Sequence, residues 1–167
     1  YALGFPDCAM SLAILHAGEP VYGLVYDHAA DLLYEGGPEF GVFRDRKKLN
    51  AVARGANEQT MIGLHFPMEP GRISALADVM ARYRVRSLGS AALNACYVAT
   101  GYLSGAVDFR VKVWDIAAGH ALIQGAGREI RYLEAAPFPL RHFHPRAPHC
   151  PYLAGTKPIC AEIQSRL

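Results

Sequence analysis

The sequence has no long apolar run and almost no excess of either charge. No uninterrupted hydrophobic stretch reaches the roughly 18 residues that a membrane-spanning helix needs, although 51% of the residues are hydrophobic. Seventeen basic residues against fifteen acidic ones leave a net charge of +2. That excess is too small for the basic surface that nucleic-acid binding requires. We therefore expect neither a membrane nor a nucleic acid as partner.

Cysteine is scarce and is not paired in the sequence. The four cysteines stand far apart, at Cys8, Cys96, Cys150 and Cys160, and none forms a C-x-x-C pair. A chain of this length without a dense cysteine framework is typical of a reducing compartment, so we expect a cytoplasmic protein. The missing pairs also disfavour a structural zinc site.

The sequence also lacks an initiator methionine. It begins Tyr1-Ala2-Leu3-Gly4 and continues directly into apolar alternation, with no charged, signal-type start. This beginning resembles an entry into the middle of a fold. We therefore expect the chain to be a fragment of a longer protein.

The patterning predicts an α/β fold in one region, 1–167. Over residues 1–55, short β-branched and aromatic runs are separated by Gly, Pro and Asp turns, which predicts an antiparallel strand meander. Over residues 56–167, candidate strands alternate with helical periodicity, which predicts layers of helices on a sheet. The expected helices cover 72–83, 92–101, 116–126 and 157–167.

Two strand-to-helix turns carry the residues most suited to chemistry. Gly89-Ser90-Ala91 stands at one turn, and Trp114-Asp115 opens the next helix. The unpaired N–H groups of a helix N-terminus suit an anionic or polyhydroxyl ligand. An acid there can hold a hard cation through oxygen, although the same acid is also a common helix-capping residue.

These turns lie within longer motifs. Residues 86–94 read R-S-L-G-S-A-A-L-N, residues 98–101 read V-A-T-G, and residues 114–119 read W-D-I-A-A-G. Together with G-E-P-V-Y-G-L-V-Y at 18–26, these segments resemble the C-terminal part of the inositol monophosphatase family. The resemblance covers nearly the whole chain, and the pair G-S-A-A and W-D-I-A-A-G is specific in combination.

The resemblance implies a Mg²⁺-dependent, lithium-sensitive phosphomonoesterase with a layered α/β/α/β sandwich, incomplete at its N-terminus, that works as a homodimer. Asp115 matches a metal ligand of the family and is the predicted catalytic residue. Gly89, Ser90 and Ala91 match the turn on the substrate side. Asp108 stands where many members place a glutamate that accepts hydrogen bonds from the hydroxyl groups of the substrate. The implied substrate is a small phosphate ester of the inositol-1-phosphate or histidinol phosphate type.

One departure from the family bears on activity. Members carry a glutamate and an Asp-Pro-[ILV]-Asp-Gly-[ST] loop ahead of the segment that matches Gly4-Phe5-Pro6, and Tyr1 aligns just after that loop. Most ligands for Mg²⁺ (or Mn²⁺) would then precede Tyr1, and one carboxylate holds Mg²⁺ poorly. We therefore expect little hydrolysis by this chain alone. The alternative is a non-catalytic, truncated relative that serves as a binding or dimerisation module.

Other residues allow a functional and a structural interpretation. The loop residues His142, His144 and His149 with Cys150 could bind zinc. His65, inside an apolar run, fits a buried and hydrogen-bonded side chain better than a base. His120 follows the W-D motif by one turn and could influence Asp115. The basic run 44–48 fits a solvated hairpin tip better than an anion site.

Overall fold

The first half of the chain forms a five-stranded antiparallel sheet. The computed structural model describes residues 6–50 and 59–167. The strands follow one another in space as in the sequence: β1 (Ala9–His16), β2 (Glu19–Asp27), β3 (Leu32–Gly37), β4 (Gly41–Arg44) and β5 (Lys47–Leu49). The predicted meander is thus present, and the part of 1–55 that falls on residues 1–5 and 51–55 lies outside the described residues.

A second five-stranded sheet is mixed. Its order is β7-β6-β8-β10-β9, formed by β6 (Met61–Leu64), β7 (Arg84–Arg86), β8 (Gly105–Asp108), β9 (Glu129–Tyr132) and β10 (Tyr152–Gly155). Strand β6 runs parallel to β7 and to β8, whereas β10 runs antiparallel to β8 and β9. The carboxyl ends of β6 and β8 therefore lie at the same edge of the sheet.

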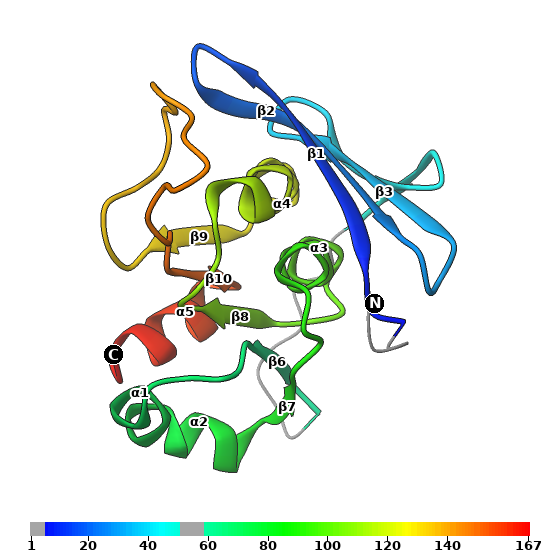
Figure 1. Ribbon diagram of the computed structural model, residues 1–167. Coiled ribbons are helices and arrows are strands. Elements are labelled where there is room, and N and C mark those ends of the chain that lie inside the picture. The colour runs from blue at the N-terminus through cyan, green and yellow to red at the C-terminus, as the bar shows by residue number, and fades with distance from the viewer. Residues whose placement is uncertain (1–5, 51–58) are drawn as a thin grey trace.

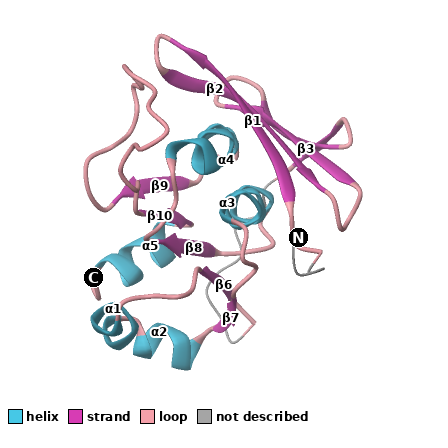
Figure 2. Ribbon diagram, viewed as in Figure 1, coloured by secondary structure: helices cyan, strands magenta, loops and turns pink. Residues whose placement is uncertain are grey.

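The helices separate and cover the two sheets. Helices α3 (Ala91–Thr100) and α4 (Val113–Gly125) lie between the sheets, and α1 (Pro70–Ala75), α2 (Ala77–Arg82) and α5 (Lys157–Gln164) cover the outer face of the second sheet (Figures 1 and 2). Counted from α5, the layers run α/β/α/β, as the family resemblance implies. Among residues 6–50 and 59–167, no helix combines the length and apolarity that a membrane crossing needs.

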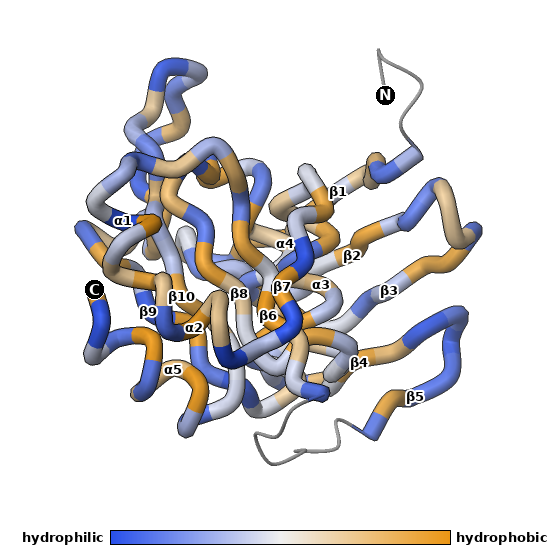
Figure 3. Tube along the Cα trace, turned by 90° about the horizontal axis from the view of Figure 1, so that it is seen from below, coloured by the Kyte–Doolittle hydropathy of each residue, from blue (hydrophilic) through white to orange (hydrophobic). Residues whose placement is uncertain are grey.

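Three elements differ from the sequence prediction. The helix expected over 72–83 is two short helices, because the chain leaves helical geometry at Leu76, the C-cap of α1. The basic run 44–48 contains the two-residue turn Asp45-Arg46, and its lysines continue into the unpredicted strand β5. This turn is hydrophilic in Figure 3, in agreement with a solvated tip. Helix α4 begins at Val113, three residues earlier than predicted.

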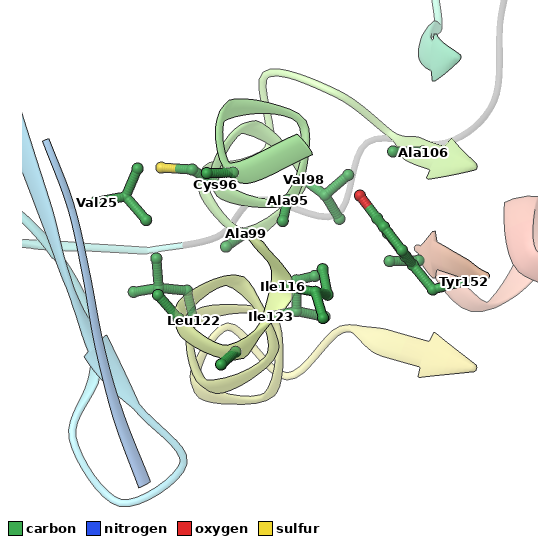
Figure 4. Packing of buried hydrophobic residues seen from close by; sticks show 14 of the residues in the cluster. Val25, Ala95, Cys96, Val98, Ala99, Ala106, Ile116, Leu122, Ile123 and Tyr152 are labelled. Carbon is green, nitrogen blue, oxygen red and sulfur yellow. The ribbon is translucent and has the colours of Figure 1, made fainter. Parts of the chain in front are cut away.

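The core lies on both sides of the α3–α4 layer. Val25 of β2 faces Leu122 on the side of the first sheet, and Ile116 and Ile123 point toward Tyr152 on the side of the second sheet (Figure 4). All five side chains are fully buried. Close helix packing explains the small residues of both helices. A Cβ atom on Gly119 of α4, for example, would overlap the Cβ of Ala95 on α3.

The termini of α3 are encoded locally. Ser90 is the N-cap, and its side-chain oxygen accepts a hydrogen bond from the backbone N–H of Leu93 at 3.3 Å. Gly101 is the C-cap with φ +84°, a left-handed conformation that glycine adopts without steric cost. The glycine cap predicted from the sequence is therefore present. It ends α3 just before the turn into β8.

Candidate functional site

The predicted site residues line one cleft. Gly89, Ser90, Ala91, Asp108 and Asp115 all border a cavity of about 350 Å³. They come from the N-terminus of α3, the end of β8 and the first turn of α4. The structure thus gathers residues that are up to 26 positions apart in the sequence. Their roles in binding and catalysis stay predictions.

Asp108 is a buried carboxylate with one oxygen left over. The residue is 1% exposed, and its Oδ1 accepts a hydrogen bond from the backbone N–H of Arg110 at 2.8 Å. Its Oδ2 has no hydrogen-bond partner among the described residues. Burial raises the pKa of the Asp108 carboxyl, while the Arg110 hydrogen bond and the nearby His65 act in the opposite direction. A ligand that donates a hydrogen bond to Oδ2 would satisfy this group.

His65 belongs to the cleft, which the sequence interpretation missed. Its Nδ1 lies 3.5 Å from Oδ2 of Asp108 and makes no hydrogen bond with any described residue. The side chain is 25% exposed, so it is not the fully buried, hydrogen-bonded histidine that we expected. The strand order would have placed His65 in the cleft. His65 directly follows β6, which pairs in parallel with β8, whose last residue is Asp108.

Asp115 has a structural role in addition to its predicted one. It is the third residue of α4, and its Oδ2 accepts a hydrogen bond from the backbone N–H of the N-cap residue Lys112 at 2.9 Å. An acid in the first helical turn also interacts favourably with the helix dipole. The Nζ of Lys112 donates a hydrogen bond to the Ala147 carbonyl oxygen at 2.6 Å, which links this turn to the loop after β9. Asp115 therefore stabilises the N-terminus of α4 through Oδ2 and also borders the cleft.

A profile of the inositol monophosphatase family matches residues 1–165. The chain belongs to this family. It is 38% identical over 131 residues to an inositol-1-monophosphatase of Mesorhizobium japonicum, covering 74% of this chain and 49% of that relative. It is 29% identical over 171 residues to the Nus factor SuhB of Xylella fastidiosa, covering 98% of this chain and 62% of that one. The chain thus spans about half to three-fifths of the length of these relatives.

Solved structures of this inositol monophosphatase family share the fold. The extragenic suppressor protein SuhB of Bartonella henselae superposes with a TM-score of 0.83 at 27% identity, covering 98% of this chain and 62% of that structure. The staphylococcal SaIMPase-II with bound inositol monophosphate gives a TM-score of 0.77 at 25% identity, covering 97% and 63%. The layered architecture expected from the resemblance is confirmed.

The described part of this family member does not by itself make a magnesium site. Mg²⁺ needs several oxygen ligands in octahedral geometry, and residues 6–50 and 59–167 contain no group of three or more His, Cys, Asp or Glu residues that could hold a metal. The zinc hypothesis for the loop fails on the same ground. Among the described residues, the structure does not bring its candidate ligands together into a group that could hold a metal: His142, His144, His149 and Cys150. Cys150 is instead buried, and its backbone N–H donates a hydrogen bond to the Val111 carbonyl oxygen.

His120 lies in the core, away from the cleft. Its Nδ1 is 2.9 Å from the Tyr132 hydroxyl, and its ring stacks on Tyr132 and contacts Phe138 edge-on. Burial lowers the pKa of His120 to about 4. The suggested influence on Asp115 has no contact to support it, so we assign His120 to packing between α4 and β9.

Proposed function

We propose that this chain forms the substrate-recognition part of a phosphatase that hydrolyses a small polyol or sugar phosphate. The observation that carries the proposal is the cleft, which combines a buried, unsatisfied carboxylate oxygen with a helix N-terminus and a second carboxylate. The names of several relatives, including inositol-1-monophosphatase and fructose-1,6-bisphosphatase, agree with this chemistry. Two structures of the staphylococcal SaIMPase-II hold bound inositol monophosphate and bound 2′-AMP, respectively.

Each group of the cleft has a proposed role. Oδ2 of Asp108 accepts a hydrogen bond from a substrate hydroxyl. The backbone N–H groups of Ala91 and Ala92, at the start of the ten-residue helix α3, face an anionic or hydroxyl oxygen. Asp115 supplies one carboxylate oxygen to Mg²⁺ or Mn²⁺, and the remaining ligands must come from outside the described residues. Inositol 1-phosphate and histidinol phosphate are the proposed substrate types.

The test is phosphate release by the full gene product from inositol 1-phosphate and from histidinol phosphate, with Mg²⁺, Mn²⁺ or a chelator. We expect release with a divalent cation and none with the chelator. Asp115→Asn should lower kcat at least about 100-fold, which corresponds to about 2.7 kcal/mol of barrier. Asn keeps a side-chain oxygen for the Lys112 N–H, so the melting temperature should change little.

The exposed Glu39 supplies the matched control, because it lies in the turn before β4 and outside the cleft. Glu39→Gln removes one negative charge, as Asp115→Asn does, and should leave kcat unchanged. Equal rates in wild type and Asp115→Asn would refute the assignment of Asp115. Absence of release with every substrate and cation would refute the phosphatase proposal.

One observation favours a second candidate, a binding or dimerisation module. Met10, Leu12 and Ile14 on the outer face of β1 are 60%, 53% and 53% exposed, and grouped exposed apolar side chains commonly mark an interaction surface. Light scattering over a concentration series tests the proposed homodimer. A dimer that dissociates on Leu12→Lys, without phosphate release in the assay above, would support this candidate over the enzyme.

A further inference from the structure

Two buried polar atoms at the candidate cleft lie close together, and neither has another partner. Nδ1 of His65 is 3.5 Å from Oδ2 of Asp108. Neither atom makes a hydrogen bond with the residues that the structure describes. Both residues border the cleft of about 350 Å³. Since buried polar groups in native proteins are nearly always paired, the imidazole and the carboxylate are natural partners of each other.

The backbone holds both side chains in place. The backbone N–H of His65 donates a hydrogen bond to the Val107 carbonyl oxygen at 3.3 Å, which continues the parallel pairing of Leu64 with Val107. His65 therefore lies beside Asp108, the last residue of β8. The backbone N–H of Arg110 donates a hydrogen bond to Oδ1 of Asp108 at 2.8 Å. The carboxylate is thus fixed through Oδ1, and Oδ2 is left for the imidazole and for a ligand.

A proton on Nδ1 of His65 would complete this arrangement. The separation of 3.5 Å exceeds the usual N–H···O distance of about 2.7–3.2 Å, so the ring has to move slightly closer. Hydrogen bonds in ligand-free sites are often long and shorten when a ligand binds. Oδ2 of Asp108 still has a lone pair for a substrate hydroxyl group, because each oxygen of an ionised carboxylate can accept two hydrogen bonds. The two contacts are therefore compatible.

Several elements contribute titratable groups around Asp108. Burial raises the pKa of the Asp108 carboxyl, and the charge of Asp115 acts in the same direction. The Arg110 backbone N–H, His65 and His149 lower this pKa. In the described part of the chain, His65 is the residue within ion-pair distance of the carboxylate. The complete set of neighbours is His65 after β6, Arg110 after β8, Asp115 in α4, His149 before β10, Tyr152 in β10 and Asp7 before β1.

We propose that His65 is a positioning residue of the substrate site, whose Nδ1–H donates a hydrogen bond to Oδ2 of Asp108 and keeps this carboxylate ionised and oriented toward substrate hydroxyl groups. The proposal rests on the proposed function, because it takes the Asp108 cleft as the place of those hydroxyl groups. An ionised carboxylate accepts stronger hydrogen bonds than a neutral one, and it repels the ester phosphate. His65 thus determines, through Asp108, that the polyol end of the substrate lies there.

Two ligands with the same ring size test the proposal by titration calorimetry on the full gene product, with Ca²⁺ in place of Mg²⁺ to limit turnover. Inositol 1-phosphate has hydroxyl groups for Asp108, and cyclohexyl phosphate has none. The ratio of their association constants, the hydroxyl preference, isolates these contacts because the phosphate group ionises alike in both ligands. Between pH 8 and pH 4.5, we expect the hydroxyl preference of the wild type to fall as Asp108 takes up a proton.

His65→Phe keeps a ring but removes the donor. A neighbouring opposite charge shifts a carboxyl pKa by about 1–3 units, so the hydroxyl preference should fall at a pH about one unit higher than in the wild type. At pH 7 it should be about fivefold smaller or less. His65→Asn supplies an amide N–H near the position of Nδ1 and should restore most of the preference. His16→Phe is the matched control, because His16 is exposed at the end of β1 remote from the cleft.

The outcomes separate the two proposals. An unchanged hydroxyl preference in His65→Phe, an equal weakening of both ligands at every pH, or a His65→Asn variant as weak as His65→Phe overturns the role of His65 while the phosphatase proposal stands. A shifted preference without phosphate release in the presence of Mg²⁺ overturns the phosphatase and keeps the role of His65. If neither ligand binds to the wild type, both proposals fail. Melting temperatures of the three variants show whether each still folds.

Discussion

At the scale of single residues, the most distinctive feature of the candidate site is a missing hydrogen bond at Asp108. The carboxylate is buried, accepts one backbone hydrogen bond and has an oxygen without a hydrogen-bond partner in the described structure. An unsatisfied buried polar group costs about 1–3 kcal/mol, so folding tolerates it only where the environment compensates or a ligand completes it. The nearby His65 compensates in part. A bound hydroxyl group that donates a hydrogen bond to Oδ2 would offset the rest of this cost.

Asp108→Asn tests this deficit. Asn keeps an oxygen for the Arg110 N–H but removes the buried charge. A raised carboxyl pKa means that the folded state binds protons more tightly than the unfolded state. Stability is therefore lost as pH rises through the folded pKa. The variant should be at least as stable as wild type at pH 7 by urea unfolding, and should bind polyol phosphates about tenfold more weakly. Lower stability with unchanged affinity would contradict the assignment.

His120 predicts a different pH dependence. Burial lowers its pKa from 6.5 to about 4, so between these values the unfolded state binds a proton that the folded state excludes. Stability is complete above pH 6.5 and is lost as pH falls toward 4, by up to about 3 kcal/mol. His120→Gln should flatten the urea midpoint between pH 7 and pH 5, and the exposed His142→Gln should not. A wild-type midpoint that does not fall would contradict the buried, neutral histidine.

At the scale of elements, the sequence predicts the helices and strands that are determined by local residue patterns. It misses the features that depend on contacts with residues distant in the sequence. The meander, β10, the Ser90-to-Gly101 helix and its glycine cap follow from turn residues and periodicity. Strand β5 was missed because its lysines resemble a solvated turn, and it is a strand only by pairing with β4. His65 was misread because its role depends on the parallel pairing of β6 with β8.

The contact between α3 and α4 gives a prediction for packing. A methyl group on Gly119 would overlap the Cβ of Ala95, and both residues lie in tightly packed helices. Gly119→Ala should therefore cost about 1–3 kcal/mol of unfolding free energy, although alanine favours helix. In Gly71→Ala, the added Cβ has no atom within 4 Å, and this control in α1 should gain up to about 1 kcal/mol. Equal effects of the two changes would show that α3 and α4 can separate at no cost.

At the scale of the whole molecule, the α3–α4 layer serves both halves of the sequence. Helix α4 contacts β1, β2 and β3 of the first sheet and β9 of the second, and α3 contacts β2 and β8. Neither sheet can therefore keep its inner face covered when this layer is lost. The candidate site has the same dependence, because its walls come from β1, α3, β8 and α4.

This shared layer predicts that residues 1–55 and 56–167 unfold together, as one domain. Trp114 fluorescence reports on α4, and hydrogen exchange of the β2 amides reports on the first sheet. In urea both signals should give the same midpoint, and Gly119→Ala should shift the two midpoints equally, because the helix pair supports each sheet. Two separate midpoints, or a shift confined to Trp114, would show that the meander is an independent unit. The cleft between β1 and the helices could then open without unfolding of the second sheet. Ligand affinity would in that case depend on how often the first sheet is packed against the helices.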